Sequence, residues 1–427
     1  MQFKLQAKAL NEALGVVGIV APRSVTPQGG AGYLFVVAGQ TCRIYSRDAL
    51  HQVRVDVDLD EVDGEGAFVY PAEKVAAMTY LDGWIQFEAG HDEANDRYWV
   101  RYETEGGFKA DDASFNPQIV MQLLDSQLGE AKTEHVFPAA VLREAIDLAK
   151  GYLAKPNDGR VEDNYKTMQL FDTTKPEWAE GDGTLFAADG VRACYVSCSV
   201  FKGKGLSIHG QHLSFLSSFL SKCEGDLTIK LGDTSTFAVN SKGQVLGWTH
   251  HVKQHGKYAY YPREMEGYVL KAPKELLTKA LGYLRSRLDS KRDKIRISYT
   301  AGDTSLRFHA SEAAGRGDAL PVGVVPVEEE VKTKDGKDAS AGKKGREEDF
   351  AINANVNHLL ALIEPVKGHE VDLRVVMVPP ANGRKARALF RTIEKFWLSE
   401  NGKLLIAPED GQMAHECEVT RFMPSKD

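Results

Sequence analysis

Residues 3–17 read FKLQAKALNEALGVV, residues 135–152 read HVFPAAVLREAIDLAKGY, and residues 268–288 read YVLKAPKELLTKALGYLRSRL. Each stretch predicts a short strand followed by an amphipathic helix, because apolar residues recur at three- and four-residue steps after the first few positions. The leucines Leu10, Leu142 and Leu276 stand at intervals of 132 and 134 residues. The chain therefore carries an internal repeat.

A second strand–helix pattern follows each first one. Its copies are FVYPAEKV at 68–75, LSIHGQHL at 206–213 and FAINANVN at 350–357. We expect helices over 72–81, 211–222 and 356–366, each followed by an alternating strand at 84–87, 227–230 and 371–375. Chance similarity is the alternative, but the near-equal spacing and the matched second halves argue against it.

The repeats predict three domains, over residues 1–131, 132–264 and 265–427. Because helices stand between runs of adjacent strands, we expect an α+β fold with antiparallel sheets rather than a doubly wound parallel sheet. Residues 328–349 (EEEVKTKDGKDASAGKKGREED) are charged and almost free of large apolar side chains. We interpret this stretch as a mobile insertion in the third domain rather than a functional tail.

The composition is that of an ordinary globular protein. Of 427 residues, 43% are hydrophobic and 26% charged, which excludes disordered and collagen-like classes. The net charge of −7 argues against a polycationic nucleic-acid coat but allows basic residues to concentrate on one face. Five cysteines, no apolar leader and no long apolar run predict a cytoplasmic location and no membrane contact.

Motifs for enzyme chemistry are missing from the sequence. GxxxxGKS/T, HExxH, GxSxG and CxxC do not occur. Cys194 and Cys198 fall on one side of a predicted strand and are interpreted as core residues rather than metal ligands. We expect no catalytic residues, no metal and no cofactor. A nucleic-acid-processing enzyme with a basic surface is the alternative.

Basic residues are unevenly distributed. The second repeat contributes Arg143, Lys150, Lys155 and Arg160, followed by Lys202 and Lys204, and the third contributes Lys274, Lys279, Arg285, Arg287, Lys291, Arg292 and Lys294. If the helices share one face, these cations form a stripe that binds phosphates without reading base sequence. A solvated basic face on each separate helix is an equally good interpretation of the helices alone.

Residues 184–194, TLFAADGVRAC, are similar to a segment of the form T-V-A-T-D-G-H-R-L-A in bacterial sliding clamps, the beta subunits of DNA polymerase III. Further stretches resemble the family in the same order along the chain: MQFKL at 1–5, RSVTP at 23–27, FVYPAEK at 68–74, SFNP at 114–117 and RFMPSKD at 421–427. Each motif is weak by itself, but their joint order over nearly the whole chain is specific.

The resemblance implies three clamp domains, with two helices of each lining a channel and the sheets on the outer rim. Two chains would close head to tail into a homodimeric ring with pseudo-sixfold symmetry. Such a ring encircles double-stranded DNA without sequence preference, so a basic channel inside an acidic rim would explain the net charge. The residues that we expect to contact DNA are Arg23, Lys150, Lys155, Arg160, Asn164, Tyr165, Lys202, Lys204 and Arg285.

The resemblance also implies a groove between the second and third domains that takes short peptides of the DNA polymerase, the clamp loader and other partners. The positions that match this groove are Ala188, Gly190, Val191, Arg192, Ala193, Arg263, Met423 and Pro424. The positions that match the dimer contacts are Phe108 in the first domain and Leu284 and Leu288 in the third.

Several positions depart from the family pattern. Lys166 and Ala193 stand where the groove has leucines, Val191 replaces a histidine, and Ser425 replaces a methionine. Residues 284–288 are more polar than a dimer contact normally is, and residues 382–397 are longer than the family core. These departures indicate a divergent member, such as one carried by a phage or a plasmid. A clamp-like protein that binds clamp partners without encircling DNA is the alternative function.

Overall fold

The computed structural model of the chain describes residues 1–21, 32–125, 131–171, 183–249, 267–288, 294–300, 303–310, 320–326, 350–378, 387–405, 407 and 413–424. The chain divides into two compact units: residues 1–144, 211–253 and 400–402 form unit 1, and residues 145–210, 254–399 and 403–427 form unit 2. The division passes through the second predicted domain, so the three domain boundaries stay a prediction. The insertion at 328–349 lies outside the described residues.

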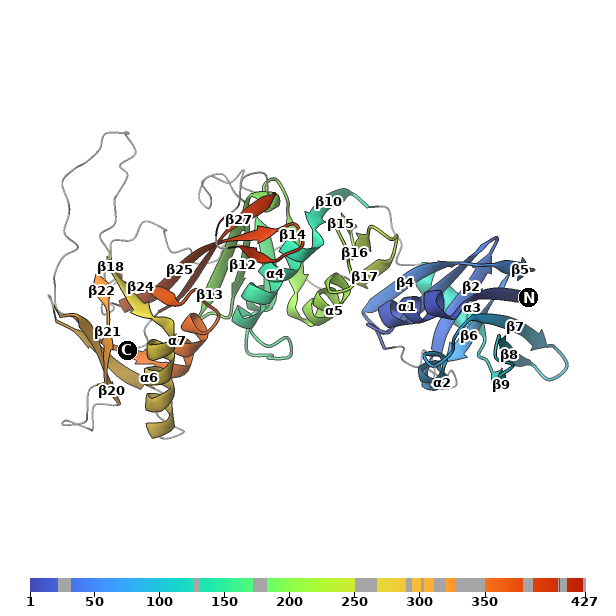
Figure 1. Cartoon of the computed structure of the whole chain (residues 1–427), viewed down its shortest axis with the longest axis horizontal. Helices are drawn as coiled ribbons and strands as arrows, with labels where there is room; N and C mark the ends of the chain where they lie inside the picture. Colours follow the sequence, from blue (N-terminus) through green and yellow to red (C-terminus); the bar gives the residue numbers. More distant parts are fainter. Residues whose placement is uncertain are drawn as a thin grey trace. The chain divides into compact units, whose positions relative to one another are not determined.

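Unit 1 contains two antiparallel sheets (Figure 1). The strands of the five-stranded sheet are, in order, β5 (Glu61–Asp63), β1 (Gln2–Gln6), β7 (Trp84–Asp92), β8 (Arg97–Thr104) and β9 (Lys109–Ala113). Those of the eight-stranded sheet are β10 (Thr133–Pro138), β15 (Asp226–Leu231), β16 (Ser235–Asn240), β17 (Val245–Thr249), β4 (His51–Asp58), β3 (Thr41–Arg47), β2 (Gly32–Ala38) and β6 (Gly66–Pro71). The helices are α1 (Ala7–Val17), α2 (Ala72–Met78), α3 (Pro117–Asp125), α5 (Gly210–Leu220) and the start of α4 (Ala139–Ala149).

Four phenylalanines join the two sheets of unit 1. Phe3 and Phe87 of the five-stranded sheet stack with ring centroids 5.1 Å apart. Phe35 and Phe68 of the eight-stranded sheet stack at 4.8 Å, and the two pairs approach each other at about 6 Å. All four rings are fully buried, so this cluster is the centre of the hydrophobic core.

The strand pair β4–β17 joins residues of the first and second repeats, and a buried polar chain crosses the same place. His51 on β4 is 3.1 Å from the Asp48 carboxylate, and its Nε2 is 2.9 Å from Nδ1 of His212 on α5. Both histidines are 3% exposed or less. Burial alone would raise the pKa of Asp48, but hydrogen bonds from the His51 side chain and from the backbone N–H groups of Leu50 and His51 lower it to about 2.

Unit 2 also contains two antiparallel sheets. The larger has the order β14 (Leu206–His209), β11 (Thr167–Phe171), β12 (Gly183–Ala188), β13 (Ala193–Cys198), β27 (Ala414–Pro424), β25 (Arg387–Ser399), β24 (Glu370–Val378), β18 (Gly267–Pro273) and β22 (Val325–Pro326), with β26 (Leu404–Leu405) beside β25. The smaller is β21 (Leu320–Gly323), β20 (Ser305–Ala310), β19 (Lys294–Tyr299) and β23 (Phe350–Asn355). Helices α6 (Lys274–Arg287) and α7 (Val356–Ile363) pack on them, and three short 3-10 turns are η1 (Lys150–Tyr152), η2 (Asp163–Lys166) and η3 (Ser199–Phe201).

The strand pair β13–β27 joins residues of the second and third repeats. Six register pairs run from Ala193 opposite Phe422 to Cys198 opposite Cys417. Arg421 on β27 is completely buried and forms an ion pair with Glu394 at 3.4 Å. A buried charge is tolerated only when it is paired, so this ion pair fixes β27 against β25.

In the described residues a similar order of elements occurs three times: a strand, a helix, four or five strands, a second helix and three or four strands. The first strand of each set pairs with the strand that follows the second helix, as β1 with β7, β10 with β15 and β18 with β24. Every strand pairing in the described ranges is antiparallel. The predicted α+β class with antiparallel sheets is therefore confirmed.

The expected repeat helices are present, but α2, α5 and α7 end two or three residues before their predicted ends. Leu276 is 54% exposed, whereas Leu277 is completely buried, like Leu10 and Leu142. Leu277 is thus the counterpart of those two leucines, one position later than the sequence comparison assigned. The helix α3 was not expected. It begins after Asn116, whose side chain accepts the N–H of Gln118 at 2.9 Å, and Pro117 is its first residue.

No helix in the described ranges has the length and apolar character that a membrane span requires.

The two adjacent leucines of α6 allow a test of the repeat. We expect Leu277→Ala to lower the free energy of unfolding by about 2–5 kcal/mol, because it opens a cavity in the core. Leu276→Ala is the matched control and should change it by less than about 0.5 kcal/mol. Urea unfolding curves of the two variants would contradict the assignment if both lost the same stability.

The charge on Asp48 makes the stability of unit 1 depend on pH. Its lowered pKa contributes about 2 kcal/mol above pH 4, and this contribution disappears as the pH falls toward 2. We expect Asp48→Asn to be less stable than the unchanged chain at pH 6, with the difference shrinking below pH 4. Asp226→Asn, at an exposed position on β15, should show no such trend in thermal unfolding. A constant difference at all pH values would contradict the role of the Asp48 charge.

Candidate functional site

Helix α6 carries four basic side chains and one acidic side chain. Lys279 pairs with Glu275, and Lys274 donates to the carbonyl of Val366. Arg285 is exposed and has no ion-pair partner among the described residues. Its charge is therefore available to an external anion.

The other predicted DNA contacts fall into two groups. Lys150 lies 2.6 Å from Asp147, and Arg160 lies 3.2 Å from Asp158. The Arg160 hydrogen bonds lower the pKa of Asp158, so this pair is ionic at neutral pH. Lys155 and Lys202 are exposed, with no ion pair in the described part of the chain, and Lys204 is half-buried. A free cation gains more from a phosphate than one that already shares its charge.

Asn164 and Tyr165, also predicted to touch DNA, lie on η2. The Asn164 side chain accepts the N–H of Tyr165 at 3.0 Å. The half-buried ring of Tyr165 packs against an apolar cluster in the β12–β13–β27 region, which we call the joint cluster: Phe186, Ala188, Ala193, Tyr195, Leu389 and Phe422. The structure therefore associates Tyr165 with the predicted groove positions.

The stretch that resembles the family most closely forms a tight turn between β12 and β13. The Asp189 carboxylate accepts the N–H groups of Val191 and Arg192 at 2.9 and 2.6 Å. Gly190 has φ +84°, a conformation that glycine adopts without strain. A side chain at this position would also meet the Tyr165 ring at 3.7 Å. The turn thus holds Gly190 beside Tyr165.

Arg192 fixes the turn to the rest of unit 2. It pairs with Asp189 at 2.8 Å, donates to the carbonyl of Gly151 at 3.1 Å and lies over the ring of Tyr152. The Tyr152 hydroxyl in turn donates to the carbonyl of Ala361 at 2.8 Å. Arg192 is therefore a positioning residue for the turn.

The last described strand carries the predicted groove residues Met423 and Pro424, next to Phe422. Phe422 belongs to the joint cluster, whereas Met423 is 1% exposed and lies in the core beneath α6 and α7. This alternation is the normal property of a strand. Pro424 pairs in register with Leu389, but its side chain is not described. Arg23 and Arg263 lie outside the described residues.

Lys166, at the position of a family leucine, is buried at 7% exposure and pairs with Asp163 at 3.0 Å. The Lys166 side chain thus forms an ion pair within η2.

The predicted dimer contacts differ in exposure. Phe108, next to β9, is 56% exposed. Leu284 is 2% exposed in the core, and Leu288 packs against that core. The exposed apolar residues of α6 are instead Leu276 and Tyr283, at 54% and 53%. These two were missed, although their spacing of seven places them on one helix face.

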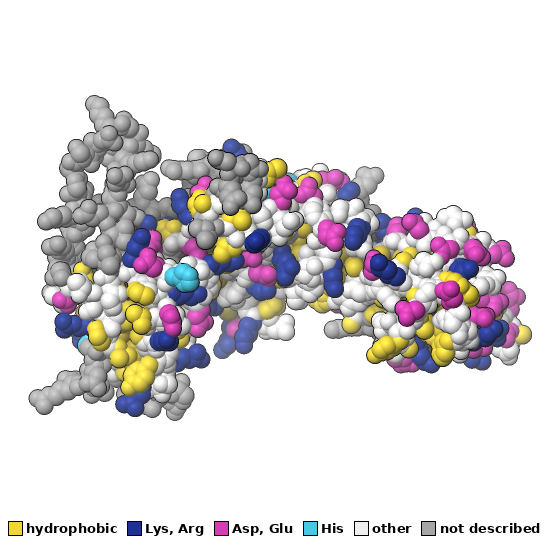
Figure 2. Space-filling model, viewed as in Figure 1, with side chains coloured by type: hydrophobic (Ala, Val, Ile, Leu, Met, Phe, Trp, Pro, Cys, Tyr) yellow, Lys and Arg dark blue, Asp and Glu magenta, His cyan; other side chains and the backbone are white. Residues whose placement is uncertain are grey.

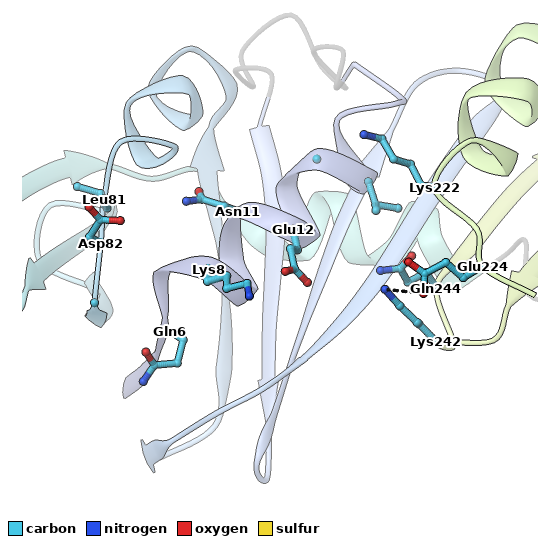
Figure 3. Close-up of a pocket in the computed structure, with 13 residues that line it drawn as sticks. Gln6, Lys8, Asn11, Glu12, Leu81, Asp82, Lys222, Glu224, Lys242 and Gln244 are labelled. Atoms are coloured by element: carbon cyan, nitrogen blue, oxygen red, sulfur yellow. Dashed lines mark ion pairs between the residues drawn. The ribbon is translucent and has the colours of Figure 1, made fainter.

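A cavity of about 780 Å³ lies along α1 in unit 1 (Figure 3). Its walls carry Lys8 and Asn11 from α1, Lys222 after α5, and Lys242 in the turn after β16, where Glu224 lies 3.9 Å away. Lys8 and Lys222 are exposed, with no ion pair within the described ranges. They are further candidate phosphate contacts, missed because they are distant in sequence and lie outside the basic stretches.

Exposed acidic side chains gather at one end of unit 1. Figure 2 shows them over the end of unit 1 that holds β5, where Asp60, Glu61, Asp63 and Glu65 are exposed. In the described residues, no group of three His, Cys, Asp or Glu side chains is arranged to hold a metal ion.

Solved structures of bacterial sliding clamps match the chain over its whole length. The DNA polymerase sliding clamp from Pseudomonas aeruginosa with ligand is 18% identical with a TM-score of 0.68, and 100% of both chains is covered. The Helicobacter pylori beta clamp in complex with carprofen is 13% identical with a TM-score of 0.68 and the same coverage. The beta subunit of DNA polymerase III from Thermotoga maritima is 13% identical with a TM-score of 0.67, covering 100% of this chain and 99% of that one.

The chain has the sliding-clamp fold. No protein-family model and no curated protein matches the sequence. At 13–18% identity the likeness establishes the fold, and it confirms the resemblance to a divergent clamp drawn from the short motifs. The roles of the individual residues in a sliding clamp stay predictions.

The two groups of cations give a test of DNA contact. We expect Arg285→Ala to reduce the slope of log affinity against log salt by about 1, because one phosphate contact is lost. Arg160→Ala should change the slope less, since Arg160 shares its charge with Asp158. Fluorescence anisotropy with a short labelled duplex at several salt concentrations measures both. Equal slopes for Arg285→Ala and the unchanged chain would contradict the assignment.

Proposed function

We propose that the chain is a DNA sliding clamp: a non-enzymatic processivity factor that encircles double-stranded DNA as a homodimeric ring. The observation that carries this proposal is the full-length match to the sliding-clamp fold. The protein would need no cofactor and would act in the cytoplasm, where it would tether the replicative polymerase and be opened by a clamp loader.

The sheet edges support ring closure. Two strand pairs, β4–β17 and β13–β27, each join two repeats. In both, the third strand after the first helix of one repeat pairs with the last strand of the next repeat. By the same rule, the third repeat provides β21 as the third strand after its first helix, and the first repeat provides β9 as its last strand. Each of these strands has one partner within the described ranges. Two copies could therefore pair β21 with β9 twice and close head to tail, with three clamp domains in each chain.

The side chains near these edges suit a contact between copies. Phe108 precedes β9 and is exposed in the single chain. Tyr283 and Leu276 lie on the exposed face of α6, which packs against β20 and β21. Burying these apolar groups would favour association.

The cations support sliding rather than sequence reading. A ring that cannot leave DNA sideways needs only weak phosphate contacts, such as those that Lys155, Lys202 and Arg285 could make. The exposed acidic residues around β5 would face away from DNA and account for the negative net charge.

The turn at Asp189–Arg192, Tyr165 and the end of β27 support the predicted docking groove. Gly190 is held beside the Tyr165 ring, and Val191 lies on the same hydrogen-bonded turn, so a peptide would meet a preformed surface. Lys166 is withdrawn into its own ion pair, which makes the groove differ from that of the family.

One observation favours the alternative, a clamp-like protein that binds clamp partners without encircling DNA. Pro321 lies in the edge strand β21. Proline lacks the N–H that strand pairing uses and is a common protection of free edges.

Retention on DNA distinguishes the two functions. A ring loaded onto nicked circular DNA should remain bound through gel filtration and should be lost when the circle is cut, because only a ring slides off free ends. An exposed patch that merely binds DNA would give equal retention on both forms, and this outcome would contradict encirclement.

The groove can be tested with one substitution. Val191→Glu places a charge on the Asp189 turn next to Gly190, and we expect at least tenfold weaker binding of a labelled clamp-binding peptide of a bacterial polymerase. Val136→Glu, at an exposed position on β10, is the matched control and should bind normally. Unchanged affinity of Val191→Glu by calorimetry would remove Val191 from the groove.

A further inference from the structure

Two thiols face each other across the strand pair β13–β27. Cys198 and Cys417 are direct register partners, and their Sγ atoms are 3.4 Å apart. Their exposures are 0% and 2%. Neither forms a disulfide in the structure.

The backbone at this pair already suits a disulfide. Directly opposite residues of antiparallel strands have Cα atoms about 4.5 or about 5.5 Å apart, depending on the type of pair. Both values lie within the range of about 4.4–6.8 Å that disulfides occupy. The two sulfurs could therefore bond after side-chain movement, without a shift of the strands.

We propose that Cys198 and Cys417 are a redox modification site at which a small oxidant, such as hydrogen peroxide, forms an intrachain disulfide. One sulfur attacks the peroxide and becomes a sulfenic acid, and the first water leaves. The other sulfur attacks this sulfenic acid, forms the S–S bond and releases the second water. The two thiols lose two electrons and two protons, and the peroxide takes up both.

The pair lies at one end of the β13–β27 ladder, where local opening would let a small oxidant reach it. Cys198 is the last residue of β13, and Cys417 is near the start of β27. Residues at the end of a strand ladder open more often than those at its centre. The other three thiols have a different setting. Cys42 lies opposite Val37 and Val57, and Cys194 lies opposite Ala187 and Arg421, so neither has a thiol as a register partner. Cys223 donates to the carbonyl of Phe219.

The bond would join residues 219 positions apart and tie β27 to β13 covalently. The chemistry does not depend on the proposed function. If the chain is a clamp, the bond would also fix the strand that carries Met423 beside the rest of the groove.

The test uses the full-length folded chain. Incubation with hydrogen peroxide, quenching with an alkylating reagent and unfolding should leave three free thiols of the five. Peptide mapping without reduction should find one cross-linked pair, containing Cys198 and Cys417. The oxidised chain should unfold at a higher temperature than the reduced chain, and dithiothreitol should reverse the shift.

Two variants complete the experiment. Cys417→Ala should retain all of its remaining thiols, whereas Cys194→Ala, at a buried position on the same strand β13, should still form the cross-link. Calorimetry of each variant before oxidation shows whether it is folded. Five free thiols after oxidation of the unchanged chain, or sulfinic and sulfonic acids without a cross-link, would overturn the proposal.

Discussion

Backbone hydrogen bonding across the sheet edges is the constraint on which the rest of this structure depends. An edge strand presents unpaired N–H and C=O groups, which other strands satisfy. Here β17 covers the edge of β4, and β27 covers the edge of β13, so sheets run without interruption from one repeat into the next. The strands β9 and β21, each with one partner in the described ranges, are the places where the same constraint would bring in a second copy.

Each of the two strand pairs that join repeats also buries polar or reactive groups that fix its register. At β4–β17 the groups Asp48, His51 and His212 form a hydrogen-bonded chain in which both histidines are buried. At β13–β27 Arg421 is paired with Glu394, and two thiols face each other. Such groups are costly when their partners are displaced, so a slip of one strand by one residue would be strongly disfavoured. The joints therefore determine where the turn at Asp189 and the end of β27 meet.

The sequence predicts the repeated strand–helix elements because the burial of one face of each element gives its apolar residues a regular spacing along the chain. It does not separate Leu276 from Leu277, since both are apolar and only packing decides which one faces the core. The family resemblance indicated Leu284 as a dimer contact, although Leu284 is buried and Tyr283 is exposed. The short motif around Gly190 identified candidate groove positions, but the burial of Lys166 and the placement of Lys8 and Lys222 around one cavity depend on tertiary contacts. Asn116 followed by Pro117 is a typical start of a helix, but the polar residues that follow them led to the prediction of a linker instead of α3.

The central claim, a ring closed through β9 and β21, is tested most directly by the mass of the protein in solution. Light scattering during gel filtration at micromolar concentration should give about twice the 47.1 kDa of one chain. Replacing Phe108 by aspartate should return the mass to that of a single chain. A mass of 47.1 kDa for the unchanged protein at this concentration would contradict the closed ring and favour the clamp-like protein that does not encircle DNA.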